Sequence, residues 1–163
     1  MACKVDGCYY FHSEYPFCMH TPCEIMIRGI KYKSVTHYLM VRKAEVLEKS
    51  DVASDILKGN NFGEWQYFYF NHISQKDARW DEVFEDELYL ANVAKFTQDD
   101  SNKEDLLDLC PHPAKFVYAD PFDPNLGIGI GIRAAFQGEQ WNGKNLLGEV
   151  LTRVRDEIVA AEG

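Results

Sequence analysis

The chain has 163 residues, a length typical of one globular domain. Hydrophobic residues make up 46% of it and aromatic residues 13%, which excludes a disordered chain and predicts a substantial core. Lysine and arginine number 17 and aspartate and glutamate number 26, so the formal net charge is −9. We therefore expect no general binding to nucleic-acid backbones, although a local basic pocket is compatible with this charge.

The cysteine content predicts an intracellular protein, cytoplasmic or nuclear, with five reduced thiols. The segment Met1–Tyr10 lacks the apolar core of a signal peptide, and the absence of a run of about 18 apolar residues predicts no membrane span. Cys18 and Cys23 flank His20, but their spacing is long for a zinc pair and no second pair matches it. We expect ordinary thiols, no metal and no cofactor.

The first predicted elements are short strands and a buried helix. Residues 9–11 and 24–33 have extended patterns, and the second of these predicts a hairpin around Gly29. Ser34 can cap a helix that runs toward Val46. The middle of this helix is apolar on all sides, which predicts that it is buried.

A second helix is predicted around Val52–Leu57, and Lys58-Gly59-Asn60-Asn61 is a strong stop signal for it. An aromatic stretch follows. It could form a surface for a protein partner or for stacked bases, or it could pack into the core beneath a loop. The large area of these side chains favours packing, and any interface is expected here. The aromatic residues are Phe62, Trp65, Tyr67, Phe68, Tyr69 and Phe70.

The remaining elements are mostly helical. Apolar spacing predicts a helix over residues 81–95, and Ser101–Glu104 fits a capping box for a short helix. Residues 115–119 predict a strand, and an apolar stripe over Leu147–Ile158 predicts a last helix that begins near Asn142-Gly143. Short strands and more numerous helices, without βαβ alternation, predict one α+β domain over residues 1–163, mostly helical with a small sheet.

The turn Asp123–Gly129, after the predicted strand, is the first candidate for chemistry. Functional loops are commonly mounted at strand ends, and Gly127 and Gly129 allow a ligand to approach the backbone closely. The alternative is an Asx-turn in which Asp123 caps its own loop. On the residues alone, the two interpretations are equally supported.

The start of the last helix is a second candidate. A helix N-terminus attracts anions, and Lys144 adds a positive charge there. The alternative is a plain helix cap. Gly148 lies inside the helix, where glycine is unfavourable, and so indicates close packing or a close ligand.

Several stretches, taken in chain order, resemble the NADAR (NAD- and ADP-ribose-associated) family, which includes the YbiA-like N-glycosidases. The resemblance covers nearly the whole chain and is weakest at about 58–79, a segment that looks divergent or partly inserted. It implies a YbiA-like fold and hydrolysis of an N-glycosidic bond to ribose, in ADP-ribosyl or riboflavin-pathway compounds. The stretches that carry it are Tyr15-Pro16-Phe17, Val35-Thr36-His37-Tyr38 with Lys43-Ala44, Trp80-Asp81, Ala94–Gln98, Val117–Gly129 and Trp141–Arg155.

The resemblance also implies a set of site residues. Asp123 corresponds to a catalytic position, whereas Thr36 stands where the family has its leading catalytic candidate, a glutamate. Cys18-Met19 replaces a Ser-Asn pair and Leu126 replaces a tryptophan. A threonine cannot act as a base near neutral pH. The expected ligand-binding positions are Lys43, Trp80, Lys95, Gln98, Gly127, Gly129, Lys144, Asn145 and Arg155.

Two hypotheses of function follow. The three replacements favour a catalytically impaired member, a pseudoenzyme, that binds a protein partner through Phe62–Phe70 or an ADP-ribose-like small molecule. The alternative is an active N-glycosidase in which Asp123 works with another acid. A second carboxylate within about 10 Å of Asp123 would favour the alternative.

Overall fold

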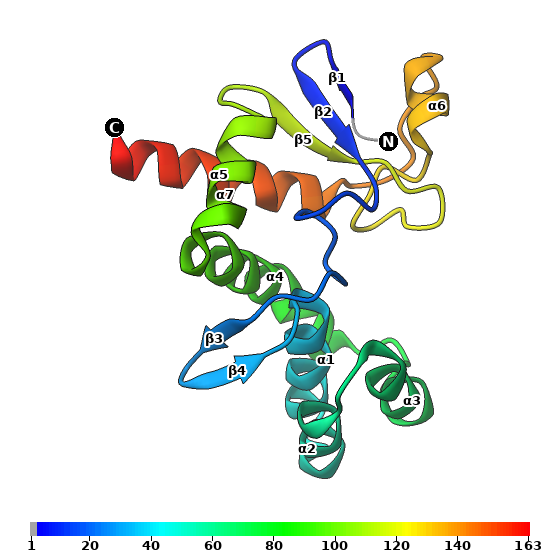
Figure 1. The fold of residues 1–163 in the computed structure, drawn as a ribbon. Helices are drawn as coiled ribbons and strands as arrows, with labels where there is room; N and C mark the ends of the chain where they lie inside the picture. Colours follow the sequence, from blue (N-terminus) through cyan, green and yellow to red (C-terminus); the bar gives the residue numbers. More distant parts are fainter. Residues whose placement is uncertain (1–2) are drawn as a thin grey trace. The chain divides into compact units, whose positions relative to one another are not determined.

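A computed structural model of the chain describes residues 3–163, and of Cys3 and Lys4 it describes the backbone alone. The described part contains seven helices and two small sheets, which confirms the predicted α+β class (Figure 1). The chain divides into two compact units, Met1–Cys18 with Phe96–Gly163 and Met19–Lys95. The domain boundaries and the insertion at about 58–79 stay predictions, and the Cys3 thiol lies outside the described side chains.

The sheet of the first unit consists of β1 (Cys3–Val5), β2 (Cys8–Phe11) and β5 (Lys115–Tyr118), in the order β1-β2-β5. β1 and β2 are antiparallel, whereas β2 and β5 are parallel, with Phe11 opposite Tyr118. The carboxyl ends of β2 and β5 therefore lie side by side. The segments that follow these two strands leave the sheet at the same edge.

Helices α5 (Asp100–Leu109), α6 (Ile132–Phe136) and α7 (Leu146–Glu162) complete this unit, and α7 packs on β5 (Figure 1). The stripe predicted for the last helix is confirmed, because its five residues are all buried: Leu147, Val150, Leu151, Val154 and Ile158.

Three local features of this unit differ from the predictions. The cap of α5 is Asp99, whose carboxylate accepts the N–H of Asn102 at 2.9 Å, so the cap predicted at Ser101 is wrong. The helix begins earlier because Asp99 already satisfies one of its first N–H groups. α7 begins after Asn145, a left-handed residue with φ 55°, and not near Asn142. The short helix α6 was not predicted.

The second unit begins with the predicted hairpin, formed by β3 (Ile25–Ile27) and β4 (Ile30–Tyr32). Arg28 and Gly29 join these strands, and both have a positive φ, 54° and 80°. Two residues of this conformation make the tight turn whose twist suits antiparallel strands.

Helices α1 (Val35–Val46), α2 (Ser50–Lys58), α3 (Phe62–His72) and α4 (Ala78–Gln98) follow the hairpin, and α2 packs on both α1 and α3. The side chain of Ser34 accepts the N–H of His37 at 3.0 Å, so the predicted cap of α1 is confirmed. Nine residues of α1 are buried, which confirms that this helix is buried.

The aromatic stretch does not pack beneath a loop, because it forms α3, which Asn61 caps by accepting the N–H of Glu64 at 3.0 Å. Trp65 is its buried residue, whereas Tyr67 is 64% exposed and Phe70 is 63% exposed. Closely spaced aromatic residues point around the whole circumference of a helix, so they cannot all face the core.

Candidate functional site

The predicted site residues fall in both units. Thr36, Lys43, Trp80 and Lys95 belong to the second unit, and the others belong to the first. Within each unit the structure shows which side chains hold the fold and which face open space.

Thr36 contacts a histidine that the sequence analysis connected only with zinc. Its Oγ1 lies 2.6 Å from Nδ1 of His20, and its backbone N–H donates to the carbonyl of Met19 at 3.2 Å. The His20 ring stacks on Phe62, with centroids 4.8 Å apart. Burial of the ring, and secondly the charge of Lys95, lower the pKa of His20 below its ordinary value of 6.5. At pH 7 the pair is therefore a neutral imidazole beside a hydroxyl.

His37, the next residue of α1, is fully buried and fully paired. Its Nδ1 accepts the N–H of Lys33 at 3.0 Å, and its Nε2 donates to the carbonyl of Ile56 at 2.9 Å. The ring stacks on Trp65 with centroids 4.1 Å apart. Burial lowers the pKa of His37, so this imidazole is neutral and structural.

Lys43, Trp80 and Lys95 are all buried. The ammonium of Lys43 donates to the carbonyl of Gln75 at 2.9 Å and to the hydroxyl of Tyr69 at 3.2 Å, and so ties α1 to the chain at and after α3. Trp80 packs edge-on against Phe84. At least Lys43 therefore has a structural task, and the ligand-binding roles of all three stay predictions.

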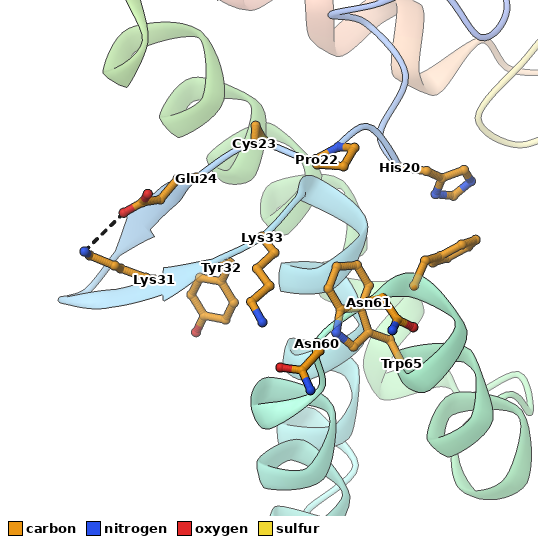
Figure 2. Close-up of a pocket in the computed structure, with 11 residues that line it drawn as sticks. His20, Pro22, Cys23, Glu24, Lys31, Tyr32, Lys33, Asn60, Asn61 and Trp65 are labelled. Carbon is orange, nitrogen blue, oxygen red and sulfur yellow. Dashed lines mark ion pairs between the residues drawn. The ribbon is translucent and has the colours of Figure 1, made fainter.

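A pocket of about 720 Å³ opens beside His20 within the second unit (Figure 2). The predicted ligand-binding residues are not among those that line it. The Lys31–Glu24 ion pair, 3.1 Å long, stands at its edge. The lining residues come from the 20–24 segment, β4 and the residue after it, the α2–α3 loop and the start of α3: His20, Pro22, Cys23, Glu24, Lys31, Tyr32, Lys33, Asn60, Asn61, Phe62 and Trp65.

In the first unit, Asp123 has the geometry of an Asx-turn. Its Oδ1 accepts the N–H groups of Asn125 at 3.0 Å and Leu126 at 2.8 Å. A Cβ on Gly127 would lie 2.8 Å from the carbonyl of Tyr118, and one on Gly129 would lie 2.6 Å from that of Asn142. Both glycines thus let the protein's own backbone approach closely.

Asn145 is buried and bridges two backbone groups of β5. Its Oδ1 accepts the N–H of Tyr118 at 2.8 Å, and its Nδ2 donates to the carbonyl of Phe116 at 3.0 Å. Gly148 has no room for a Cβ beside that carbonyl, so its role is close packing.

Arg155 is also fully buried. It donates to the carbonyl of Cys110 at 2.6 Å and to Asp156 at 2.9 Å. Lys144 and Gln98 are exposed.

A polar cluster at the carboxyl ends of β2 and β5 was missed. The hydroxyl of Tyr118 donates to Asp120 at 2.9 Å, and Nε2 of His12 lies 3.6 Å from the same oxygen. Burial, and then Asp120, raise the pKa of Tyr118. Ligands often bind at the carboxyl ends of parallel strands. That rule could have found these residues, but the pairing of β2 with the distant β5 was not predicted.

The described residues contain no group of three or more His, Cys, Asp or Glu side chains that could hold a metal ion, and Cys18 and Cys23 carry half-buried thiols. None of the described helices has both the length and the apolar character needed to cross a membrane.

The family and the fold of the chain follow from comparison with known proteins. A family model described as the NADAR domain matches residues 4–159. Protein irg-1 of Caenorhabditis elegans is 29% identical over 133 residues, which are 79% of this chain and 62% of that protein. The NMR structure of the E. coli protein YbiA superimposes with a TM-score of 0.73 at 21% identity, over 94% of this chain and 85% of that one. The likeness to YbiA concerns the fold.

Proposed function

Because the chain belongs to the NADAR domain family, we propose that it is a binding module that has lost the family's N-glycosidase reaction. The ligand that we propose is an ADP-ribose-like small molecule. The alternative ligand is a protein partner that binds the segment Phe62–Phe70. The observation that carries the proposal is the pair formed by Thr36 and His20.

The reaction requires a carboxylate beside the sugar. Hydrolysis of an N-glycosidic bond passes through a positively charged, oxocarbenium-like ribose, and a carboxylate both stabilises that charge and activates the attacking water. Thr36 offers a neutral hydroxyl at the position where the family resemblance places the glutamate. This hydroxyl is already hydrogen-bonded to His20, whose lowered pKa keeps the imidazole neutral at pH 7. The pair therefore carries no negative charge.

The Asp123 turn gives a second line of support. One oxygen of its carboxylate is occupied by two backbone N–H groups of its own loop. Leu126, where the family resemblance places a tryptophan, cannot supply the large flat ring that would stack on a base.

The test is a turnover assay with ADP-ribosylated nucleosides and ribosylaminouracil phosphates, in which free ribose products are measured. We expect no turnover by the unmodified protein and measurable turnover by Thr36→Glu. The matched control is Thr36→Gln, whose side chain has the length of glutamate without its charge, and this variant should stay inactive. Robust turnover by the unmodified protein, abolished by Asp123→Asn, would overturn the proposal.

The second candidate is an active N-glycosidase that uses Asp123 together with Asp120. The observation in its favour is a second carboxylate in the same turn, since the backbone N–H of Asp123 points to the carbonyl of Asp120 at 3.5 Å. Asp120 contacts the hydroxyl of Tyr118 and faces His12, so the cluster has groups that could pass a proton. If this candidate is right, Asp120→Asn and Asp123→Asn each abolish turnover of the unmodified protein.

A further inference from the structure

A groove of about 490 Å³ runs between α1 and α2, within the second unit. Glu45 lines this groove and follows Thr36 by nine positions, about two and a half turns of an α-helix. The two side chains therefore face opposite sides of α1. None of the expected ligand-binding residues is among the described residues that line the groove, and none of Phe62–Phe70 is either.

Small side chains of α2 keep the groove open. α1 ends at Val46, and Glu48, with a left-handed φ of 59°, turns the chain toward α2. Ala53 and Ser54 of α2 then line the groove, where longer side chains would fill it. Ala53 is 6% exposed and Val41, opposite on α1, is 2% exposed. The inner part of the groove is therefore apolar and suits an aliphatic chain.

The carboxylate of Glu45 gives the rim of the groove a negative charge. Glu45 is exposed, and its one printed cation partner is Arg42, whose guanidinium lies 3.2 Å away. The same guanidinium lies 2.8 Å from the buried carboxylate of Glu87. One positive charge thus faces two negative charges, so this group keeps a net charge of −1.

Glu48 repeats this arrangement at the turn between the helices. Its exposed carboxylate lies 3.7 Å from the guanidinium of Arg79, which also pairs with Asp77 at 2.9 Å. This second group also has one positive and two negative charges, a net charge of −1. The described residues that line the groove include no lysine, arginine or histidine. The groove therefore combines an apolar interior with a rim whose negative charge is not balanced.

We propose that this groove binds an arginine side chain from a basic segment of a protein partner. The aliphatic stem lies on Val41 and Ala53, and the guanidinium meets Glu45 and Glu48. Long basic side chains bury their stems on apolar surfaces while their charged heads stay in water. The planar guanidinium matches carboxylates with paired hydrogen bonds, which the ammonium of lysine does not.

The net charge of −9 adds a longer-range attraction for such a partner. The inference goes beyond the proposed function, because the groove shares no lining residue with the proposed ligand site or with Phe62–Phe70. It holds whether or not the chain retains hydrolysis.

The test titrates the full chain into a fluorescein-labelled peptide of alternating alanine and arginine, and fluorescence anisotropy measures the binding. Matched peptides carry lysine or glutamate in place of arginine. We expect saturable binding of the arginine peptide that weakens as salt is added, weaker binding of the lysine peptide and no binding of the glutamate peptide. No saturable binding of the arginine peptide, or equal binding of the lysine peptide, would overturn the proposal.

Two double variants locate the binding. Glu45→Gln with Glu48→Gln should weaken binding of the arginine peptide by roughly tenfold or more, because it removes both charge-assisted partners. Glu82→Gln with Glu85→Gln is the matched control, since it removes the same charge at the same spacing from exposed positions of α4. It should leave binding nearly unchanged. Equal losses in the two double variants would indicate a general attraction to an acidic surface and would overturn the proposal.

Ser54→Leu separates the shape of the groove from its charge. Ser54 is half-buried in the lining, so a leucine there fills the groove and leaves both carboxylates in place. Binding of the arginine peptide should weaken, while circular dichroism shows an unchanged fold. Ser50→Leu, at an exposed position of the same lining, is the second variant in case Ser54→Leu fails to fold. Unchanged binding in a folded variant of this kind would contradict the proposed seat of the stem.

Two other occupants are distinguished in the same experiments. Sedimentation of the chain alone detects a second copy: a dimer that Glu45→Gln with Glu48→Gln dissociates would assign the groove to self-association and overturn the proposal. Spermine carries positive charge without a planar head. If it binds as tightly as the arginine peptide, the groove is a polyamine site and the proposal is equally overturned.

Discussion

Replacing Asn145 by alanine should destabilise the protein strongly, because its carboxamide satisfies two buried backbone groups. Asn145 is 3% exposed, and its side chain bonds the N–H of Tyr118 and the carbonyl of Phe116. β5 is the last strand of its sheet, so these groups lie on an edge that no other described strand covers. Asn145 supplies the partners that such a strand would otherwise provide.

The magnitude follows from the groups left behind. Each buried N–H or carbonyl that loses its partner costs about 1–3 kcal/mol, so two cost about 2–6 kcal/mol. The left-handed backbone of Asn145, with φ 55°, adds about 1 kcal/mol when alanine replaces an asparagine that tolerates it. This sum is a large share of the roughly 5–15 kcal/mol by which domains are stable.

Urea denaturation followed by circular dichroism measures this loss, and two further variants separate its parts. Asn145→Gly loses both hydrogen bonds without the backbone strain, so it should be less damaging than Asn145→Ala. Asn145→Asp keeps an acceptor for Tyr118 but sets an acceptor against the carbonyl of Phe116. A change of less than about 0.5 kcal/mol in Asn145→Ala, the size of an ordinary surface substitution, would refute the reasoning. That result would instead favour the ligand-binding role that the family resemblance implies for Asn145.

Three further predictions concern the second unit. Because the buried His37 has a pKa below 6.5, the unfolded chain binds a proton there more readily than the folded chain does. The free energy of unfolding should therefore fall as the pH drops below 6.5. A free energy of unfolding that does not change with pH in this range, measured by urea titration, would contradict the prediction. Thr36→Glu places a carboxylate beside His20 and should raise its pKa in an NMR titration, whereas Thr36→Gln should not. Lys43→Met should cost about 1–3 kcal/mol in urea denaturation, because the carbonyl of Gln75 loses a donor. Unchanged stability with weaker ligand binding would show that Lys43 serves the ligand instead.

Local patterns predicted much of the fold. The cap at Ser34, the hairpin turn at Gly29 and the apolar stripe of α7 each depend on residues a few positions apart, and all three are confirmed. The family resemblance and the YbiA-like fold are confirmed as well. The helix α3 was missed because its aromatic residues are not confined to one face, so they give no helical periodicity.

The candidate sites were harder to predict, because they depend on contacts between distant residues. His12 meets Asp120 only because β2 pairs with β5, more than a hundred residues later in the sequence. His20 reaches Thr36 across a hairpin, and its spacing to two cysteines suggested a different chemistry. The residue types could be seen in the sequence, but their neighbours could not.

Lys43, Asn145 and Arg155 match positions where the resemblance implies ligand contacts, yet each bonds the backbone carbonyl of another segment in its own unit. Their presence is therefore accounted for by the fold alone, and it does not by itself support a retained reaction. The positions that carry information about function are those without such a task. Thr36 is the position on which the proposed loss of hydrolysis rests, because its hydroxyl, which bonds His20, carries no negative charge and glycoside hydrolysis requires a carboxylate.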